Sequence, residues 1–265
     1  MFRKLFGPLL AALALSALSV GTAAAAAEIT WYGQAAFKIV TPGGKVIVID
    51  PFILKNPKTP ADMKDLAKVG KVDLILVTHG HFDHTADVVE LAKLTGAKVA
   101  MNADMGTTYQ TLELLAKDQL IRFNKGNGLQ PIDGVTVYMT RAEHSSTVVH
   151  KGVAHPGGEP VGYVIEMEDG RKIYHSGDTG VFGDMGWIGS YYGVDLALIC
   201  IGGHFTMDPK HAAYATRELL KPKTVMPMHY GTFGLLKGTP EQFKSALGDW
   251  SGEVVVKTPG DTWTF

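Results

Sequence analysis

Four side chains of kinds that bind metal ions lie within six residues, in the segment His79-Gly-His-Phe-Asp-His84. Side chains two residues apart in an extended chain share one side, so His79 and His81 can reach the same cation. Asp83 and His84 are offset and would point at a neighbouring position. Gly80, between His79 and His81, would permit the backbone to turn tightly. Imidazole plus carboxylate is the ligand set that zinc takes at catalytic sites, with one position left for water. The segment therefore predicts parts of two adjacent metal sites.

Three isolated residues are candidates to complete those sites, namely His144, Asp178 and His229. Each follows an apolar, strand-like run and precedes small or turn-forming residues. A rigid sheet fixes the positions of the loops at its edge, so ligands from distant parts of the chain can converge there. Taken alone, an aspartate before Thr-Gly is a common turn former, and a single histidine is commonly a packing residue. The nearby motif makes metal binding the stronger interpretation.

This order of motifs, HxHxDH, then His, then Asp within Ser-Gly-Asp-Thr, then His, resembles the metallo-β-lactamase superfamily. The chain is more narrowly similar to the branch of small metal-dependent hydrolases that contains ascorbate-6-phosphate lactonase and the UPF0173-like hydrolases. The similarity runs from about Ile29 to the C-terminus. The segments that carry it are Trp31–Phe37, Asp50–Phe52, Glu143–Ser146, Gly202–Met207 and His229–Phe233.

The resemblance implies an α+β fold, a four-layer αββα sandwich, with a binuclear metal site on its open edge. It assigns the first metal to His79, His81 and His144, the second to Asp83, His84 and His229, and a bridging role to Asp178. One departure is Gln34, where some relatives carry histidine; this puts substrate contacts, not the ligand set, in question.

The expected activity is hydrolysis of an ester, lactone or phosphodiester bond in a small molecule by a two-metal-activated hydroxide. Asp83 and His204 are the candidate catalytic residues, Asp83 to orient the nucleophile and His204 as a substrate contact or proton donor. Zn²⁺ suits the histidine-rich ligand set, whereas Mn²⁺ would suit the carboxylates. Asp50 and His175 are expected to orient ligands through hydrogen bonds.

Three other functions compete with this one. A periplasmic β-lactamase would share the fold, but such enzymes typically use a cysteine in the second site, where this chain offers Asp178. Iron-dependent redox relatives usually carry Glu in place of His81. A non-catalytic periplasmic metal-binding protein would keep the metals and hydrolyse nothing. RNA processing is disfavoured because no basic patch is visible.

The first 27 residues have the layout of a secretory signal peptide: Arg3 and Lys4, an apolar stretch, then a run of small residues ending at Ala27, with cleavage expected after Ala26 or Ala27. The expected mature domain is 28–265, periplasmic or secreted and without stable membrane insertion after cleavage, an uncleaved anchor being the alternative. Removing residues 1–27 changes the formal charge from −1 to −3. A nucleic-acid-binding face needs clustered basic residues, and none is expected here. Cys200, the single cysteine, lies in an apolar run and is expected in the core.

The apolar patterns predict alternating strands and helices, which two packed sheets with helices outside would accommodate. Strands are expected at 29–40, 45–50, 72–78, 97–101, 135–140, 161–167, 172–175, 196–201 and 224–228, and a final pair at 254–257 and 262–265. Helices are expected at 85–94, 107–116 and 209–220. Trp187, Tyr191 and Tyr192 suggest an aromatic lip over the site, and surface packing explains them equally well.

Overall fold

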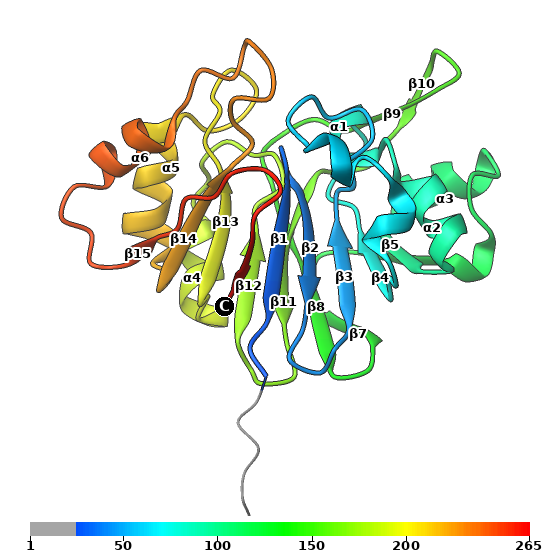
Figure 1. The fold of residues 1–265 in the computed structure, drawn as a ribbon, viewed down its shortest axis with the longest axis horizontal. Coiled ribbons are helices and arrows are strands. Elements are labelled where there is room, and N and C mark those ends of the chain that lie inside the picture. Colours follow the sequence, from blue (N-terminus) through cyan, green and yellow to red (C-terminus); the bar gives the residue numbers. More distant parts are fainter. Residues whose placement is uncertain (1–24) are drawn as a thin grey trace, which may run out of the picture.

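Two seven-stranded sheets pack face to face, with helices on both outer sides (Figure 1). The structure is a computed structural model and describes residues 25–265. The predicted signal peptide, residues 1–27, therefore lies outside the described residues except for its last three. None of the helices among the described residues is long and apolar enough to cross a membrane.

The first sheet is antiparallel from β16 to β3 and parallel from β3 to β6, in the order β16-β1-β2-β3-β4-β5-β6. Its strands are β1 (Glu28–Gly33), β2 (Ala36–Val40), β3 (Val46–Ile49), β4 (Leu74–Leu76), β5 (Lys98–Asn102), β6 (Leu120–Phe123) and β16 (Thr262–Thr264).

The second sheet repeats this mixture in the order β15-β14-β13-β12-β11-β8-β7, antiparallel from β7 to β12 and parallel from β12 to β15. Its strands are β7 (Gly128–Ile132), β8 (Val135–Arg141), β11 (Val161–Glu166), β12 (Lys172–His175), β13 (Leu196–Cys200), β14 (Thr224–Met228) and β15 (Glu253–Val254). A separate hairpin, β9 (Thr147–His150) with β10 (Val153–Pro156), projects from the body of the molecule (Figure 1).

Helices follow many of the strands. They are α1 (Phe82–Thr85), α2 (Val88–Thr95), α3 (Ala103–Thr111), α4 (Met185–Tyr192), α5 (Pro209–Tyr214) and α6 (Pro240–Leu247). Short 3₁₀ turns occupy η1 (Ala61–Met63), η2 (Leu66–Val69) and η3 (Lys117–Gln119), and α5 continues as one π-helical segment, η4 (Ala215–Leu220). Local sequence explains several starts: the Asp208 carboxylate caps α5 by accepting from the backbone N of His211 at 2.8 Å, and Thr239 and Gln242 form a capping box on α6.

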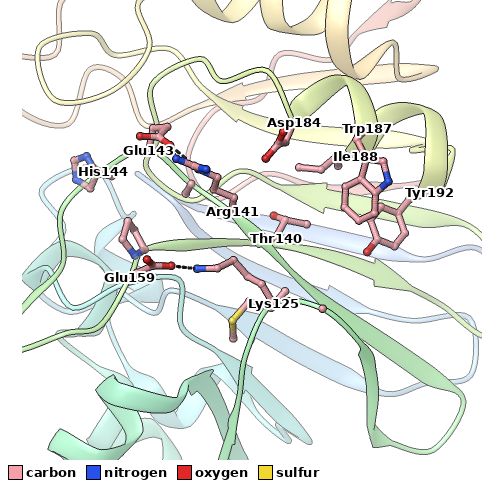
Figure 2. A pocket seen from close by; sticks show the side chains of 14 residues that line it. Lys125, Thr140, Arg141, Glu143, His144, Glu159, Asp184, Trp187, Ile188 and Tyr192 are labelled. Atoms are coloured by element: carbon pink, nitrogen blue, oxygen red, sulfur yellow. Dashed lines mark hydrogen bonds and ion pairs between the residues drawn. The ribbon is translucent and has the colours of Figure 1, made fainter.

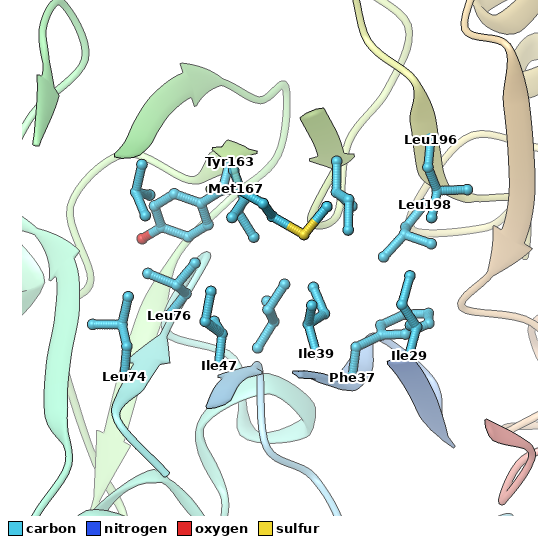
Figure 3. Packing of buried hydrophobic residues seen from close by; sticks show 14 of the residues in the cluster. Ile29, Phe37, Ile39, Ile47, Leu74, Leu76, Tyr163, Met167, Leu196 and Leu198 are labelled. Atoms are coloured by element: carbon cyan, nitrogen blue, oxygen red, sulfur yellow. The ribbon is translucent and has the colours of Figure 1, made fainter. Parts of the chain in front are cut away.

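The main core lies between the sheets, because alternate residues of each strand face inward. On β3, for example, Ile47 and Ile49 face the second sheet, whereas Val46 and Val48 face outward. Figure 3 shows the inward rows meeting, with Phe37 of the first sheet opposite Leu198 and Ile39 opposite Met167. The inter-sheet layer is therefore dry and apolar, which gives the loops at its edge a rigid base.

The outer face of each sheet buries its own helices. Residues of α2 and α3 pack with Val46, Val48 and the outward residues of β4 and β5, and residues of α4, α5 and α6 pack with the outward residues of β12 to β14. This arrangement confirms the predicted four-layer αββα sandwich.

The predicted final pair of strands is wrong. The two segments do not pair with each other: β15 joins β14 in the second sheet, and β16 joins β1 in the first. A turn at Gly260, whose N–H donates to the Trp31 carbonyl at 2.6 Å, carries the chain from one sheet to the other. Sequence proximity favoured a hairpin, but each segment completes the edge of a different sheet.

Other differences concern elements that the sequence patterns did not reveal. β6, β7, the β9–β10 hairpin, α4 and α6 were not expected, α3 begins four residues earlier than predicted, and the expected strand 29–40 is two strands joined by a turn at 34–35. These elements are short, and apart from α6 their residues show little periodicity, so packing against neighbours decides their structure.

Candidate metal centre

All seven predicted ligand residues lie at one edge of the sandwich, the edge that carries α1 and the β9–β10 hairpin (Figure 1). Each follows the end of a strand, as expected for a site built on strand-end loops. His79 and His81 follow β4, Asp83 and His84 lie on α1, and the three single residues follow β8, β12 and β14: His144, Asp178 and His229.

The seven side chains form three overlapping groups whose candidate ligand atoms lie within 4.8 Å of one another. We call His79, His81 and His144 the first triad, and Asp83, His84 and His229 the second triad. The third group contains Asp178 with one histidine from each triad. The clustering fits the binding of metal ions.

The first triad brings three ring nitrogens together. His81 Nδ1 lies 3.0 Å from His79 Nε2 and 3.2 Å from His144 Nε2. Unprotonated nitrogens at such distances direct lone pairs at one another, an arrangement that a shared cation relieves. The donor set of the first triad is therefore that of a histidine-ligated metal.

Asp178 lies between the triads. One carboxylate oxygen, Oδ2, is 3.0 Å from His229 Nε2 and 3.7 Å from His144 Nε2. The other, Oδ1, is 3.3 Å from His84 Nε2. The carboxylate can thus contact cations held by either triad.

Asp50 anchors the histidines from below, as the sequence led us to expect. Its Oδ2 lies 2.8 Å from His84 Nδ1 and accepts from the Thr78 hydroxyl at 2.6 Å, while Oδ1 accepts from the Thr78 backbone N at 2.8 Å. The Thr78 hydroxyl is in turn 3.0 Å from His79 Nδ1. Because Nδ1 of His84 is occupied in this way, its Nε2 is directed into the site. His175 lies outside this contact; its Nδ1 accepts from the N–H of Gly177 and so holds the loop before Asp178.

Gln34 belongs to the site, although the predicted ligand set did not include it. Its side-chain Nε2 donates to Asp83 Oδ2 at 2.8 Å and lies 2.7 Å from His229 Nε2. The residue is fully buried and lines the cavity described below. The signal was present in the segment 31–37, whose family-like sequence placed Gln34 where relatives carry histidine.

Three buried residues of the site hold left-handed backbone conformations that non-glycine residues rarely adopt. They are Gln34 (φ 54°), Asp50 (φ 46°) and His229 (φ 57°). Such strain costs of the order of 1 kcal/mol or more per residue and persists where surrounding structure enforces it. Backbone bonds do so here: the His229 N–H donates to the Gln34 carbonyl at 3.0 Å.

Gly80 serves a different purpose from the turn expected. A Cβ at this position would lie 2.8 Å from the carbonyl carbon of Thr147 and 2.9 Å from the backbone N of Val148. The metal-binding segment therefore passes directly against the start of β9, and only glycine fits there. The Gly80 N–H also donates to the Ser146 hydroxyl at 3.0 Å, which links the segment to the loop that follows His144.

The electrostatics of the two triads differ. Burial lowers the pKa of His79 well below the usual value, with a contribution from His84, and burial also lowers the pKa of His81 and of His144. In the second triad, burial alone would lower the pKa of His229, but the carboxylate of Asp178 outweighs it and raises the pKa to about 9.

The same balance acts on the rest of the second triad. Burial alone would lower the pKa of His84, yet the carboxylates of Asp178, Asp83 and Asp50 raise it well above the usual value. Burial likewise opposes ionisation of Asp83, but His84 and His229 hold the pKa of its carboxyl below the usual range. Without metal, the second triad is a set of ion pairs, whereas the first is a set of neutral imidazoles.

Several buried polar atoms around Asp178 lack hydrogen-bond partners among the described residues. They include His84 Nε2 and Asp178 Oδ1, which form an ion pair at 3.3 Å but no hydrogen bond. A buried polar atom without a hydrogen bond costs roughly 1–3 kcal/mol, so such atoms are expected where a bound ligand satisfies them. Both are good metal ligands, and the residues present therefore fit a bound divalent cation.

A cavity of about 580 Å³ opens above the cluster. Members of both triads and Asp178 line it, together with Gln34 and a set of apolar side chains. The cavity gives a small molecule direct access to the candidate ligand atoms.

A second hollow of about 470 Å³ meets the site at His144. Figure 2 shows His144 at one end and Trp187 and Tyr192 at the other, with the ion pairs Lys125–Glu159 and Arg141–Glu143 between them. Trp187 and Tyr192 therefore line this hollow and not the cavity over the cluster, so the predicted aromatic lip is wrong.

His204 lies on an exposed loop with a left-handed backbone (φ 60°). Its ring packs edge-on against Phe205, whose side chain lines the cavity. His204 itself borders a neighbouring hollow with Gly202 and Gly203. The structure therefore places it near the mouth of the cavity and apart from the seven clustered residues, and its catalytic role stays a prediction.

Comparisons with known proteins agree with this geometry. The family described as β-lactamase superfamily domain matches residues 45–230. A protein of Polaromonas sp. described as a UPF0173 metal-dependent hydrolase is 51% identical, covering 99% of this chain and 100% of its own. A Cupriavidus necator relative with the same description is 49% identical over 90% of this chain and 86% of its own.

Solved structures show the same fold. Igni18, a metallo hydrolase from the archaeon Ignicoccus hospitalis, superposes with a TM-score of 0.79 at 35% identity, covering 90% of this chain and 98% of that one. An isothiocyanate hydrolase from Delia radicum gut bacteria has a TM-score of 0.68 at 16% identity, over 90% of this chain and 98% of its own; this supports the fold alone.

The sandwich, with clustered histidines and aspartates at its open edge, defines a metallo-hydrolase. The chain belongs to the metallo-β-lactamase superfamily and is a metal-dependent hydrolase similar to the UPF0173 proteins.

Proposed function

We propose that this enzyme binds two divalent metal ions, one in each triad with Asp178 contacting both, and hydrolyses an ester or lactone bond of a small molecule. The observation that carries the proposal is that the group of His79, His84 and Asp178 overlaps both triads, while His84 Nε2 and Asp178 Oδ1 make no hydrogen bond among the described residues. When bound, the metals supply a hydroxide nucleophile at neutral pH and polarise the oxygen of the scissile bond.

The protein's own residues orient the reactants. Asp83 is ionised at neutral pH because neighbouring histidines lower its pKa, and Gln34 fixes its Oδ2. A carboxylate held in this way accepts a hydrogen bond from the attacking water and sets its direction. His204 is suited to protonate a leaving group if its loop closes over the cavity.

The ligand chemistry favours zinc over manganese. Five of the seven residues are histidines, and Asp50 supplies the outer hydrogen bond that zinc-bound histidines usually make. Manganese prefers a larger share of oxygen ligands.

Two rival activities are less well supported. A β-lactamase of this superfamily typically places cysteine in the second site, whereas Cys200 is fully buried beneath the loop of Asp178 with its pKa raised by burial to about 11. An iron-dependent redox enzyme typically carries Glu where His81 stands. Phosphodiester hydrolysis is less well supported because no Lys or Arg is among the residues that line the cavity.

Export to the periplasm or the extracellular medium is part of the proposal. Ala27 is buried and pairs with Phe265 through both backbone groups, N to O at 2.9 Å and O to N at 2.8 Å. Cleavage after Ala26 would leave this pairing intact. N-terminal sequencing of the protein from a periplasmic fraction should begin at Ala27, and a cytosolic protein that begins at Met1 would contradict export.

The test of the activity combines metal analysis with a substrate panel. Purified enzyme should contain two zinc ions per chain and hydrolyse esters or lactones, and removal of metal with a chelator should abolish this turnover. Full activity without metal, or hydrolysis of carbapenems at ordinary enzymatic rates in place of esters, would overturn the proposal.

A further inference from the structure

The cavity over the metal centre has a predominantly apolar lining outside its candidate ligands. Apart from the candidate ligands and Gln34, its walls are formed by Phe, Leu and Val side chains with Ser145 and Thr147. Among the residues described as lining it there is no Lys, Arg or Glu. Substrates with phosphate or carboxylate groups are normally recognised by Arg or Lys forks, which this wall does not offer.

Large apolar side chains are also exposed around the mouth of this cavity. We define the apolar rim as four such side chains, with their exposed fractions: Phe82 (62%), Val149 (65%), Phe205 (57%) and Leu235 (53%). They come from α1, β9 and two loops far apart in the sequence. Contiguous exposed apolar surface of this kind marks a binding site.

The apolar surface continues past the metal centre. Phe82, Val149 and Phe233 line both this cavity and a neighbouring one of about 500 Å³. Phe52, Phe82 and Phe233 pack on one another, with ring centroids 5.8 to 6.3 Å apart, which holds this wall in place. An elongated apolar group that enters at the rim therefore finds apolar contacts beyond the metal centre.

The hollow on the other side of His144 shows the opposite character. Its Lys125 and Arg141 are already paired with Glu159 and Glu143. The two cationic side chains of that hollow are thus each paired with a carboxylate, and neither lines the cavity over the metal centre, whereas Lys55 borders the neighbouring cavity of about 500 Å³.

We infer that the substrate carries an uncharged, extended apolar acyl or aryl group next to the scissile bond, and that the apolar rim binds this group. The inference rests on the proposed function and narrows it to esters or lactones of apolar acids. The occupant is the substrate and not a protein partner, because the candidate ligand atoms form the floor of the same cavity.

The first experiment uses metal-loaded enzyme and p-nitrophenyl esters from acetate to octanoate. Burial of each methylene is worth about a fourfold gain in binding when complete. We therefore expect kcat/KM to rise roughly thirtyfold or more across the series. p-Nitrophenyl hemisuccinate, an anionic ester of short chain, should react more slowly than the neutral pentanoate.

Leu235→Ser and Leu94→Ser form a matched pair of variants. The two leucines are equally exposed, at 53% and 55%, but Leu94 lies on α2 and lines none of these cavities. Leu235→Ser should reduce the octanoate-to-acetate ratio of kcat/KM roughly five- to tenfold, and Leu94→Ser should leave it unchanged. Equal melting temperatures would exclude a folding defect as the cause.

A binding arm tests the rim without turnover. Fluorescence of N-phenyl-1-naphthylamine, an uncharged apolar probe, should report binding to wild type and Leu94→Ser and about tenfold weaker binding to Leu235→Ser. Equal probe binding in all three proteins, no chain-length preference, or a preference for the hemisuccinate would each overturn the inference. Failure of the loaded enzyme to hydrolyse any ester or lactone would instead defeat the proposed function, while the probe arm still decides the role of the rim.

Discussion

The two triads of the metal centre use similar side chains but differ in charge. In the first triad, burial lowers the pKa of His79, His81 and His144, so their nitrogens carry lone pairs at neutral pH. In the second, nearby carboxylates outweigh burial and raise the pKa of the two histidines. The first triad can therefore accept a cation directly, whereas the second must first release protons.

The triads also differ in access. His81 and His144 are half-buried, whereas all three members of the second triad are buried. The difference teaches that one carboxylate, Asp178, can serve two unlike sites. It stabilises the protonated histidines of the second triad, while burial keeps the histidines of the first triad neutral. Five predictions test that contrast.

The largest effect is expected for Asp178→Ala, because this carboxylate is shared. Loss of its charge should remove metal from both triads and reduce kcat/KM by a factor of about 1,000 or more, since no shared ligand remains. His81→Ala should mainly empty the first triad. His211→Ala, an exposed histidine that pairs only with Asp208, is the control. Circular dichroism should show all three folded, and full metal content in Asp178→Ala would contradict the shared role.

The second prediction concerns protons. Zinc titration of chelator-treated protein should release protons when the second triad fills, because metal replaces the proton on His229, whose pKa is about 9. Filling of the first triad should release few. Calorimetry at pH 7 in buffers of different ionisation enthalpy separates the two events, and two proton-free events would contradict the contrast.

Stability without metal follows from the same pKa. The folded-state pKa of His229 is above its usual value of 6.5, so its ion pair stabilises the fold fully below pH 6.5 and is lost as the pH rises through about 9. The melting temperature of chelator-treated protein should fall over that range. A flat profile would show that His229 is not paired with Asp178.

The fourth prediction is a smaller effect for Asp50→Asn. This change removes the charge that orients His84 and, through Thr78, His79. Loss of such an outer contact typically weakens metal affinity about 10- to 100-fold. We expect the larger loss in the second triad, which Asp50 contacts directly, as measured by competition with a chromogenic chelator. Equal losses of zinc affinity in both triads would contradict this expectation, because the contact through Thr78 would then orient His79 as strongly as the direct contact orients His84.

The smallest effect is expected for Gln34→Ala. Gln34 contacts Asp83 and His229 and makes no hydrogen bond to the first triad among the described residues, so only second-triad affinity should fall, by about tenfold. Co²⁺ substitution gives a spectroscopic readout, because the two triads should yield distinct visible bands. A change in the first-triad band would contradict the assignment.

Much of the cluster could be predicted because its signal is local. Four candidate ligands sit in one short segment, and family-like motifs mark the other three, so their convergence at a sheet edge followed from strand-end positions. Gln34 was harder, because its role depends on a left-handed turn that brings its amide between residues 83 and 229.

The apolar rim could not be predicted from spacing. Phe205 and Leu235 lie in loops without periodicity, and Val149 reaches the cavity only because Gly80 lets β9 pass close to the metal-binding segment. The error over β15 and β16 has the same origin, since pairing partners far along the chain decide where an edge strand docks. By contrast, α6 carried a readable signal, the capping box of Thr239 and Gln242.

A crystal structure of zinc-loaded enzyme, with anomalous diffraction recorded at the zinc edge, tests the central claim most directly. We predict two anomalous peaks per chain, one bound by His79, His81 and His144 and one by Asp83, His84 and His229, with Asp178 contacting both. A single peak, or peaks away from these seven side chains, would contradict the account.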